Sequence, residues 1–323
     1  MRASPAIKGR AHSPISAELT VGGAFTQNGD TSRRCKPKAG RRWISGAFGR
    51  NADFKILCMT DRFFSPESMT DDKANAAAAS SPASAPRCWG LIPCAGVGLR
   101  AIAADSPAPE LPKQYQKVAG QPMVMHTLAA MLAVQRMHSV LLVVSAADGF
   151  WQGRATDARL GIAACGGATR AETVSNGLQE LLRMGASGED WVLVHDAARC
   201  LVASEQVNAL IDACLPDAVG GLLALKLPDT LKQQAAGAGP ARVAQTVERS
   251  DKWLAQTPQM FRIAALQAAL QAAGAAVTDE ASAMELAGHS PRLVPGGAQN
   301  FKVTYPDDFA LAEAVLLQRK ARG

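Results

Sequence analysis

From Trp89 to the end of the chain, short apolar runs alternate with longer amphipathic segments. Apolar runs without internal polar positions are typical of strands that are buried on both faces, as in parallel sheets. The predicted strands are Leu91–Ile92, Ser139–Ser145, Leu160–Cys165, Trp191–His195, Gly220–Lys226 and Phe301–Thr304.

Helical segments separate these strands. Pro122 suits a first helical turn, and Thr169 and Thr278 suit the N-cap because their hydroxyl groups can accept from free backbone N–H groups. The predicted helices are 122–134, 170–184, 204–214, 263–273, 278–287 and 307–319. Repeated strand–helix units predict an α/β domain with a doubly wound, mostly parallel sheet.

Residues 229–257 interrupt this alternation. Two short β-like segments, 230–233 and 243–247, flank a turn rich in Gly, Ala and Pro. The pattern predicts a β-hairpin arm that leaves the domain, and a surface flap is the simpler alternative.

The first 87 residues show no sustained periodicity, and 76–86 are low in complexity. The chain has 34 Lys and Arg against 28 Asp and Glu, and residues 1–62 hold twelve of the former and four of the latter. Residues 1–62 therefore carry a net charge of +8 and the remainder a net charge of −2. Because the excess of basic charge lies in residues 1–62, it gives no reason to expect nucleic acid as a partner of the folded part.

We expect residues 1–87 to be a largely disordered extension of a domain that spans 88–323. Three origins are open: an organellar transit peptide, a functional basic tail, or sequence upstream of the true start. The third is favoured, with Met69 as the true first residue, because Met69-Thr-Asp-Asp-Lys-Ala reads as a polar N-terminus.

Composition excludes several classes. No apolar run approaches the ~20 residues of a membrane helix, so no membrane is expected as a partner. The seven cysteines form no CxxC and no paired spacing with histidine, which argues against a zinc site and for thiols in a reducing compartment.

The stretch 89–100 has the most informative chemistry. A short apolar run is followed by Gly96 and Gly98 and then by the cation Arg100, and Lys113 supplies a second cation. Glycines let backbone N–H groups approach an anion, so the stretch predicts a triphosphate-binding loop. An ordinary strand-to-loop turn is the simple alternative.

Two other classes of glycine loop fit less well. Gly96-x-Gly98-x-x-Ala101 matches a dinucleotide fingerprint, but three prolines follow within twelve residues, where that fingerprint needs a helix. No Gly-Lys-Ser/Thr follows the glycines, which excludes a P-loop.

Charged and polar residues gather at the ends of the predicted strands. Asp196 and Arg199 follow the strand that ends at His195, Thr230 follows the strand that ends at Lys226, and Lys302 lies in the last strand. Ligands of open α/β sheets bind beyond the carboxyl ends of the strands. One acid with several cations at this edge predicts a site for a phosphorylated substrate and a metal–triphosphate, with surface salt bridges as the alternative.

Six motifs occur in order from about Trp89 to the C-terminus: Pro-x-Ala-Gly-x-Gly-x-Arg, Pro-Lys-Gln-Tyr, Val-His-Asp-Ala-Ala-Arg, Thr-Pro-Gln-x-Phe, Thr-Asp-Glu-Ala-Ser and Lys-Val-Thr-x-Pro-x-Asp. With them this part of the chain resembles the 2-C-methyl-D-erythritol 4-phosphate cytidylyltransferases of the non-mevalonate isoprenoid pathway. The resemblance says nothing about residues 1–87.

The resemblance implies a Rossmann-like nucleotidyltransferase fold. It implies transfer of CMP from CTP to 2-C-methyl-D-erythritol 4-phosphate, which gives 4-diphosphocytidyl-2-C-methyl-D-erythritol and pyrophosphate. It also implies Mg²⁺ bound mainly through the CTP phosphates, with no metal site of protein residues, and a homodimer formed through the arm. A cytoplasmic bacterial enzyme is the expected setting, and plastid targeting by the extension is a minor alternative.

The resemblance also implies roles for individual residues. Arg100 and Lys113 would stabilise the transition state, and Thr230 and Arg249 would serve the site of the neighbouring copy. CTP would contact Ala95, Gly96, Gly98, Gly167, Thr173 and Asp196, and the acceptor would contact Arg199, Thr230, Arg249, Thr257 and Lys302.

Three positions depart from the family pattern. Ala168 stands where many relatives have an acid, Cys200 follows the Asp-Ala-Ala-Arg motif where proline is usual, and the segment 101–111 is longer than expected. Two competing functions are a cytidylyltransferase for another polyol phosphate, such as ribitol 5-phosphate, and a catalytically silent nucleotide-binding or scaffold protein. The presence of both Arg100 and Lys113 argues against the silent protein.

Overall fold

In the computed structural model of this chain, the described residues are 85–96, 111–154, 157–274 and 277–322. They all belong to a compact unit that spans residues 77–323. Most of the predicted extension, Gly98, Arg100 and all but the last residue of the long segment 101–111 lie outside the described residues.

The centre of the fold is a seven-stranded sheet with the order β11-β7-β10-β6-β1-β4-β5. β10 runs antiparallel to both of its neighbours, and every other neighbouring pair in the sheet is parallel. The prediction of a mostly parallel sheet is therefore confirmed. The strands are β1 Cys88–Pro93, β4 Met137–Val143, β5 Leu160–Ala163, β6 Trp191–Val194, β7 Gly220–Lys226, β10 Trp253–Arg262 and β11 Arg292–Pro295.

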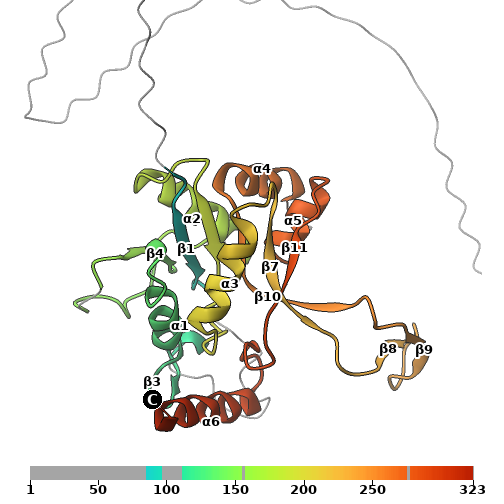
Figure 1. The fold of residues 1–323 in the computed structure, drawn as a ribbon. Coiled ribbons are helices and arrows are strands. Elements are labelled where there is room, and N and C mark those ends of the chain that lie inside the picture. The colour runs from blue at the N-terminus through green and yellow to red at the C-terminus, as the bar shows by residue number, and fades with distance from the viewer. Residues whose placement is uncertain (1–84, 97–110, 155–156, 275–276, 323) are drawn as a thin grey trace, which may run out of the picture. The chain divides into compact units, whose positions relative to one another are not determined.

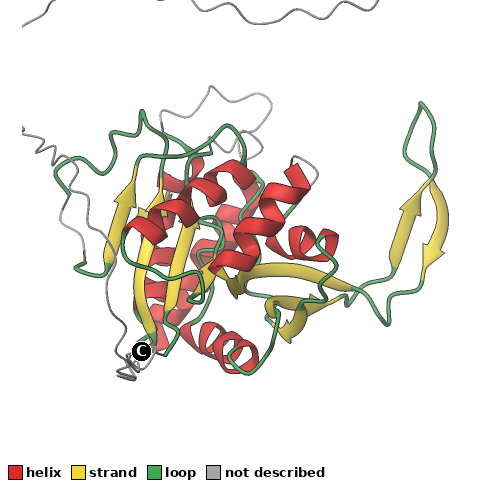
Figure 2. Cartoon of the chain, turned by 90° about the horizontal axis from the view of Figure 1, so that it is seen from above, coloured by secondary structure: helices red, strands yellow, loops and turns green. Residues whose placement is uncertain are grey.

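Helices cover both faces of this sheet (Figures 1 and 2). One apolar cluster contains residues of α1 and α3, and the other contains residues of α2, α4 and α5. The last helix, α6, packs on a third cluster beside the short β2–β3 hairpin. The helices are α1 Met123–Leu132, α2 Arg170–Arg183, α3 Ser204–Cys214, α4 Ile263–Ala273, α5 Glu280–Leu286 and α6 Pro306–Arg322. The short elements are η2 Lys113–Tyr115, β2 Lys117–Val118 and β3 Gln121–Pro122.

Strand β1 shows why the apolar runs do not alternate. Ile92 packs into the cluster on the α1–α3 face, whereas Trp89 and Leu91 pack into the cluster on the other face. All three side chains are at most 2% exposed. A strand with apolar neighbours on both faces needs apolar residues at every position.

One predicted strand of the sheet is wrong, and two observed strands were not predicted. Residues 301–304 are not a strand; Val303 makes a backbone hydrogen bond to Ala198 and packs with α6 instead. The strand at one edge of the sheet is β11, in which only Val294 is buried, so its apolar pattern is too weak to predict it. Strand β10 was also missed, because buried polar residues and Pro258 interrupt its apolar positions.

The predicted cap of α2 is confirmed, and that of α5 is displaced by one residue. The Thr169 hydroxyl accepts from the backbone N–H of Glu172 at the start of α2. At α5 the N-cap is Asp279 and not Thr278, because the Asp279 carboxylate accepts from the backbone N–H of Ser282 at 2.9 Å.

The predicted arm is present as a separate two-stranded sheet of β8 Leu231–Gln234 and β9 Val243–Val247. It projects from the body of the domain (Figure 1). Its residues are mostly exposed, Val243 to 62%. Among the described residues the arm pairs with no other strand, and an isolated hairpin is only marginally stable in water. Among the described helices, none has the length and apolarity needed to cross a bilayer.

Candidate active site

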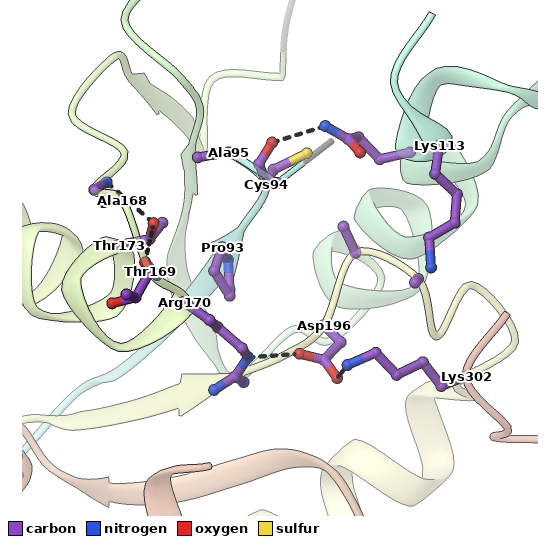
Figure 3. Close-up of a pocket in the computed structure, with 15 residues that line it drawn as sticks. Pro93, Cys94, Ala95, Lys113, Ala168, Thr169, Arg170, Thr173, Asp196 and Lys302 are labelled. Atoms are coloured by element: carbon purple, nitrogen blue, oxygen red, sulfur yellow. Dashed lines mark hydrogen bonds and ion pairs between the residues drawn. The ribbon is translucent and has the colours of Figure 1, made fainter. Parts of the chain in front are cut away.

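The predicted site residues meet beside β1, where the chain stops adding strands on one side of the sheet and begins to add them on the other. From β1 the chain adds β4 and β5 on one side and then returns to add β6 on the other side. Loops that leave the carboxyl ends of β1 and β6 diverge at such a switch point and leave a crevice for a ligand. A cavity of about 250 Å³ lies there, and we call it the central cavity (Figure 3).

The central cavity collects residues from five segments. Cys94, Ala95 and Gly96 follow β1, and Gly167 to Arg170 and Thr173 lie at the start of α2. Lys113 and Gln114 belong to η2, Asp196 follows β6, and Lys302 precedes α6. Ala95, Gly96, Lys113, Gly167, Thr173, Asp196 and Lys302 were all predicted from the sequence, and the structure brings them together.

Lys113 is anchored in the wall of this cavity by its own short helix. Its Nζ donates to the backbone carbonyl of Val303 at 2.6 Å. Its neighbour Gln114 is buried and donates to the carbonyl of Cys94 at 2.9 Å, and the buried Tyr115 donates to the Asp148 carboxylate at 2.5 Å. These three bonds fix the loop after β1 and the ammonium group of Lys113 relative to each other.

The turn before α2 requires glycine at two positions. A Cβ atom at Gly166 would lie 2.3 Å from the Cβ of Ala95, and one at Gly167 would lie 2.4 Å from the Cβ of Glu172. Glycine therefore lets this turn lie against the loop after β1. The backbone N–H of Gly167 donates to the Thr173 hydroxyl at 3.1 Å, so these two predicted residues form one unit.

Ala168 has no acidic side chain, and a nearby carboxylate serves its backbone instead. The Glu172 carboxylate accepts from the backbone N–H groups of Ala168 at 2.7 Å and of Thr169 at 3.2 Å. Glu172 belongs to the capping box in the first turn of α2, where negative charge is favourable.

Asp196 is the centre of a buried charge network. Its two carboxylate oxygens lie 3.0 Å from Nε of Arg170 and 2.9 Å from Nζ of Lys302, and Arg199 lies further away at 3.8 Å (Figure 3). Burial acts to raise the pKa of the Asp196 carboxyl, but Arg170 and Lys302 outweigh burial and hold this pKa well below its usual range. The carboxylate is therefore ionised at every physiological pH.

A second cavity of about 180 Å³, which we call the side cavity, adjoins the central cavity. Arg170, Asp196 and Lys302 line both cavities. The side cavity adds Arg199 and Thr257, two further residues predicted from the sequence. Arg199 is held by hydrogen bonds from its guanidinium to the carbonyls of Asn300 at 2.7 Å and Ala255 at 3.2 Å.

Thr257 is engaged within the protein. Thr257 is buried, with 3% of its surface exposed. Its hydroxyl oxygen accepts from the backbone N–H of Asp196 at 3.0 Å and lies 2.9 Å from Nδ1 of His195. In this structure Thr257 therefore fixes the backbone that carries Asp196.

His195 is a neutral, fully buried part of this network. Its Nε2 donates to the carbonyl of Arg199 at 3.2 Å, so Nδ1 is left to accept from the Thr257 hydroxyl. Burial lowers the pKa of the His195 imidazole from 6.5 to about 4.

This depressed pKa predicts acid sensitivity of the fold. Between pH 6.5 and pH 4 the unfolded chain binds a proton at His195 that the folded chain does not bind. The contribution of His195 is therefore complete above pH 6.5 and falls with decreasing pH, by roughly 3 kcal/mol in total. Urea unfolding of the wild type and of His195→Gln, measured at several pH values in this range, should show a steeper pH dependence for the wild type. Equal slopes would contradict the assignment.

Two predicted residues do not reach either cavity. Thr230 precedes β8 and Arg249 follows β9, so both lie at the base of the arm, and both are exposed. They are not among the residues that line the central or the side cavity of the same chain. Within one copy, the structure therefore does not bring them to the site.

Sequence reasoning missed four residues around the two cavities. Arg170, Asp279 and Glu280 form or support the walls, and the buried Gln259 donates to the Asp279 carboxylate at 2.8 Å. Arg170 had a usable signal, since a cation in the first turn of a helix opposes the helix dipole. The other three stand in recognised motifs, but nothing in their spacing indicates that β10 and α5 meet at this edge.

Comparisons with known proteins identify the family. The family model of IspD, 2-C-methyl-D-erythritol 4-phosphate cytidylyltransferase, matches residues 89–318. The chain belongs to this family. The family consists of nucleotidyltransferases, and the matched range covers both cavities and the arm.

Individual relatives in the cytidylyltransferase family are similar over the same region. A 2-C-methyl-D-erythritol 4-phosphate cytidylyltransferase of Bordetella pertussis is 52% identical over 227 residues, which are 69% of this chain and 96% of that protein. A bifunctional enzyme IspD/IspF of Albidiferax ferrireducens is 62% identical over 237 residues, which are 73% of this chain. The match spans only 54% of that longer protein.

Solved structures of the cytidylyltransferase family share the fold. A crystal structure of 4-diphosphocytidyl-2C-methyl-D-erythritol synthase has a TM-score of 0.59 and 36% identity, and covers 72% of this chain and 98% of that chain. The cytidylyltransferase of Thermus thermophilus has a TM-score of 0.55 and 31% identity, and covers 71% of this chain and 98% of that chain.

One departure from the cytidylyltransferase pattern has a clear structural setting. Cys200, which stands where proline is usual, is 2% exposed and packs in the cluster beneath α6. Burial raises the pKa of the Cys200 thiol to about 11. It is therefore an apolar packing residue and not a reactive thiol.

Proposed function

We propose that the central and side cavities are where this chain transfers CMP from CTP to 2-C-methyl-D-erythritol 4-phosphate. The reaction follows from the family, and it gives 4-diphosphocytidyl-2-C-methyl-D-erythritol and pyrophosphate in isoprenoid precursor synthesis. The assignment of the reaction to these cavities rests on one observation. Asp196, Lys302 and Arg170 line both cavities, so two anionic substrates can meet across a single charge network. The family match favours this acceptor over ribitol 5-phosphate.

In this proposal CTP occupies the central cavity. The turn at Gly167 and Thr173 faces the base, and the loop through Ala95 and Gly96 follows the triphosphate, with Gly98 and Arg100 beyond the described residues. The acceptor occupies the side cavity, where Arg199 and Lys302 provide positive charge for its phosphate. Thr257 supports that cavity through the backbone of Asp196.

The chemistry needs charge more than it needs a protein nucleophile. An oxygen of the acceptor phosphate attacks the α-phosphorus of CTP, and the bond from that phosphorus to the pyrophosphate oxygen breaks. Both reactants are anions, so cations between them lower the barrier. Lys113 lines the central cavity as a point charge, and the sequence adds Arg100 as a planar fork.

Mg²⁺ enters this proposal as part of the CTP substrate. Asp196 is the sole carboxylate among the described residues that line the central cavity, and both of its oxygens already face cations. Among the described residues, no three His, Cys, Asp or Glu side chains are grouped as a metal site would need. These residues fit an ion held mainly by the triphosphate oxygens, where it would neutralise phosphate charge.

The direct test is pyrophosphate release from CTP with each candidate acceptor. We expect release with 2-C-methyl-D-erythritol 4-phosphate and a much lower kcat/KM with ribitol 5-phosphate. A preference for ribitol 5-phosphate would assign the chain to the alternative acceptor. Binding of CTP without release of pyrophosphate in the presence of any polyol phosphate would indicate a silent binding protein.

We also propose that two copies assemble through the arm, so that Thr230 and Arg249 complete the side cavity of the neighbouring copy. Support comes from the arm itself, which is exposed, carries Val243 and the exposed Leu254 beside it, and lacks further packing among the described residues of one copy.

Arg249→Ala should mainly raise the Michaelis constant for the acceptor. Light scattering should give the mass of a dimer, and a fully active monomer would contradict the proposal.

Mixing two variants tests whether the arm acts on the partner. Lys113→Ala disables the central cavity of its own copy, and Arg249→Ala disables the arm that the other copy uses. A mixed dimer then has one intact site, so co-refolded variants should recover roughly a quarter of wild-type activity at low acceptor concentration. Recovery would be absent if Arg249 served the cavity of its own chain.

A further inference from the structure

Arg170 occupies an electrostatically unfavourable position. It is the first residue of α2, where the helix dipole places partial positive charge. Its side chain is only 29% exposed, so it also loses much of its hydration. A cation at such a place needs strong partners, and the structure supplies two of them.

Both partners of Arg170 are carboxylates on other elements. The guanidinium binds Glu280 with two hydrogen bonds, of 2.6 Å and 3.0 Å, and its Nε donates to Asp196 at 3.0 Å. Glu280 is the first residue of α5 and is 1% exposed. Burial acts to lower the pKa of the Arg170 guanidinium, but the two carboxylates outweigh burial and raise this pKa, so the cation is permanent.

Arg170 lies where three cavities meet. It lines the central cavity, the side cavity and a third cavity between α2 and α5 that also includes Leu270, Thr278 and Glu280. Figure 3 shows its side chain reaching from the start of α2 to Asp196, which Lys302 approaches from the other side. Glu280, in contrast, lines only the third cavity.

We infer that Arg170 is a positioning residue that couples the two substrate sites, by fixing Asp196 and by tying the turn that faces the base to the start of α5. This inference rests on the proposed function, in which the central cavity takes CTP and the side cavity takes the acceptor. When Lys302 moves its charge to the acceptor phosphate, Arg170 remains hydrogen-bonded to the Asp196 carboxylate and keeps its orientation. Glu280 acts through Arg170 and has no contact with either substrate.

The geometry of the fork makes this role specific to arginine. A planar guanidinium can bind one carboxylate with two parallel bonds and still offer Nε to a second carboxylate. The ammonium group of a lysine keeps the charge but is a single point, so it cannot hold both Glu280 and Asp196. Arg170→Lys therefore removes the coupling while it preserves the net charge of the site.

The test uses Arg170→Lys, Glu280→Gln, the double variant and the control Arg183→Lys. Arg183 lies at the far end of the same helix, and its side chain is 65% exposed. Calorimetry gives the dissociation constant of CTP, steady-state kinetics gives the Michaelis constant of the acceptor, and thermal unfolding reports the fold. We expect Arg170→Lys and Glu280→Gln each to weaken CTP binding and to raise the acceptor Michaelis constant by about tenfold.

Non-additivity separates this coupling from a merely structural role. Because Glu280 acts through Arg170, the double variant should be no worse than Arg170→Lys alone, and Arg183→Lys should match the wild type. Additive losses, or a lowered unfolding temperature with both substrate constants unchanged, would overturn the inference. An effect of Arg170→Lys on CTP without any effect of Glu280→Gln would also overturn it, since Arg170 would then be a direct CTP ligand.

The outcome is independent of the proposed reaction in one respect. If the wild type binds CTP but releases no pyrophosphate, the proposed function fails, yet the calorimetric comparison of Arg170→Lys with Glu280→Gln still decides whether Glu280 acts through Arg170.

Discussion

Lys113→Ala should lower turnover by roughly a thousandfold while it changes the affinity for CTP much less. The side chain lines the central cavity beside the loop after β1. In the proposed function this is where charge develops on the transferred phosphoryl group. A cation that acts mainly on the transition state changes kcat more than ground-state binding. The fold should remain intact, because the hydrogen bond from Nζ to the Val303 carbonyl is only partly buried.

Steady-state kinetics with circular dichroism checks this expectation. Lys117→Ala is the matched control, since Lys117 is an exposed lysine only four residues away that lines neither cavity. Arg100→Ala should resemble Lys113→Ala. If Lys113→Ala kept near-normal turnover and only weakened CTP binding, Lys113 would be a ground-state anchor for the triphosphate and not a transition-state group.

Asp190→Ala should lower the free energy of unfolding by about 3–5 kcal/mol, the largest stability effect that we expect. Asp190 is 4% exposed and lies just before β6, at the end of the sheet away from the cavities. Its carboxylate accepts from the backbone N–H groups of Arg87 and Ser187, from the Arg87 guanidinium and from Nε1 of the buried Trp89. Removing it leaves the buried Nε1 of Trp89 and the two part-buried backbone N–H groups without this acceptor.

The control for this prediction is Asp212→Ala. Asp212 also pairs with an arginine, Arg136, but its side chain is 69% exposed, so the loss should be at most about 1 kcal/mol. Urea denaturation of both variants gives the comparison. The turnover of folded Asp190→Ala should equal that of the wild type, and a small stability change or a selective loss of turnover would contradict the account.

Much of the fold follows from local pattern. Helices 204–214 and 263–273 and strand 220–226 have the predicted bounds because their apolar positions match one period throughout. Strand β10 was not predicted, because the polar residues Gln256, Thr257 and Gln259 are buried in it, where they serve the site and its neighbours. Local sequence cannot distinguish a polar residue that is buried for a tertiary bond from one that faces water.

The site was predictable where a motif carries its own chemistry. The loop after β1, Asp196, Lys113 and Lys302 meet as expected, because parallel strands deliver their following loops to one edge. Arg170 and Glu280 were not predicted as a pair, since they are 110 residues apart and meet only when α2 and α5 cover the same face. The arm is a different case: the sequence predicted its residues, but the structure of one copy does not show which site they serve.

The most direct measurement of the central claim follows CTP labelled at its α-phosphate. The account predicts that label moves to 2-C-methyl-D-erythritol 4-phosphate, one labelled product for each pyrophosphate, in the wild type and in Lys117→Ala. Lys113→Ala should bind labelled CTP and yet transfer almost none. Label that appears as free CMP, remains on the protein or moves equally well in Lys113→Ala would contradict transfer at the central cavity.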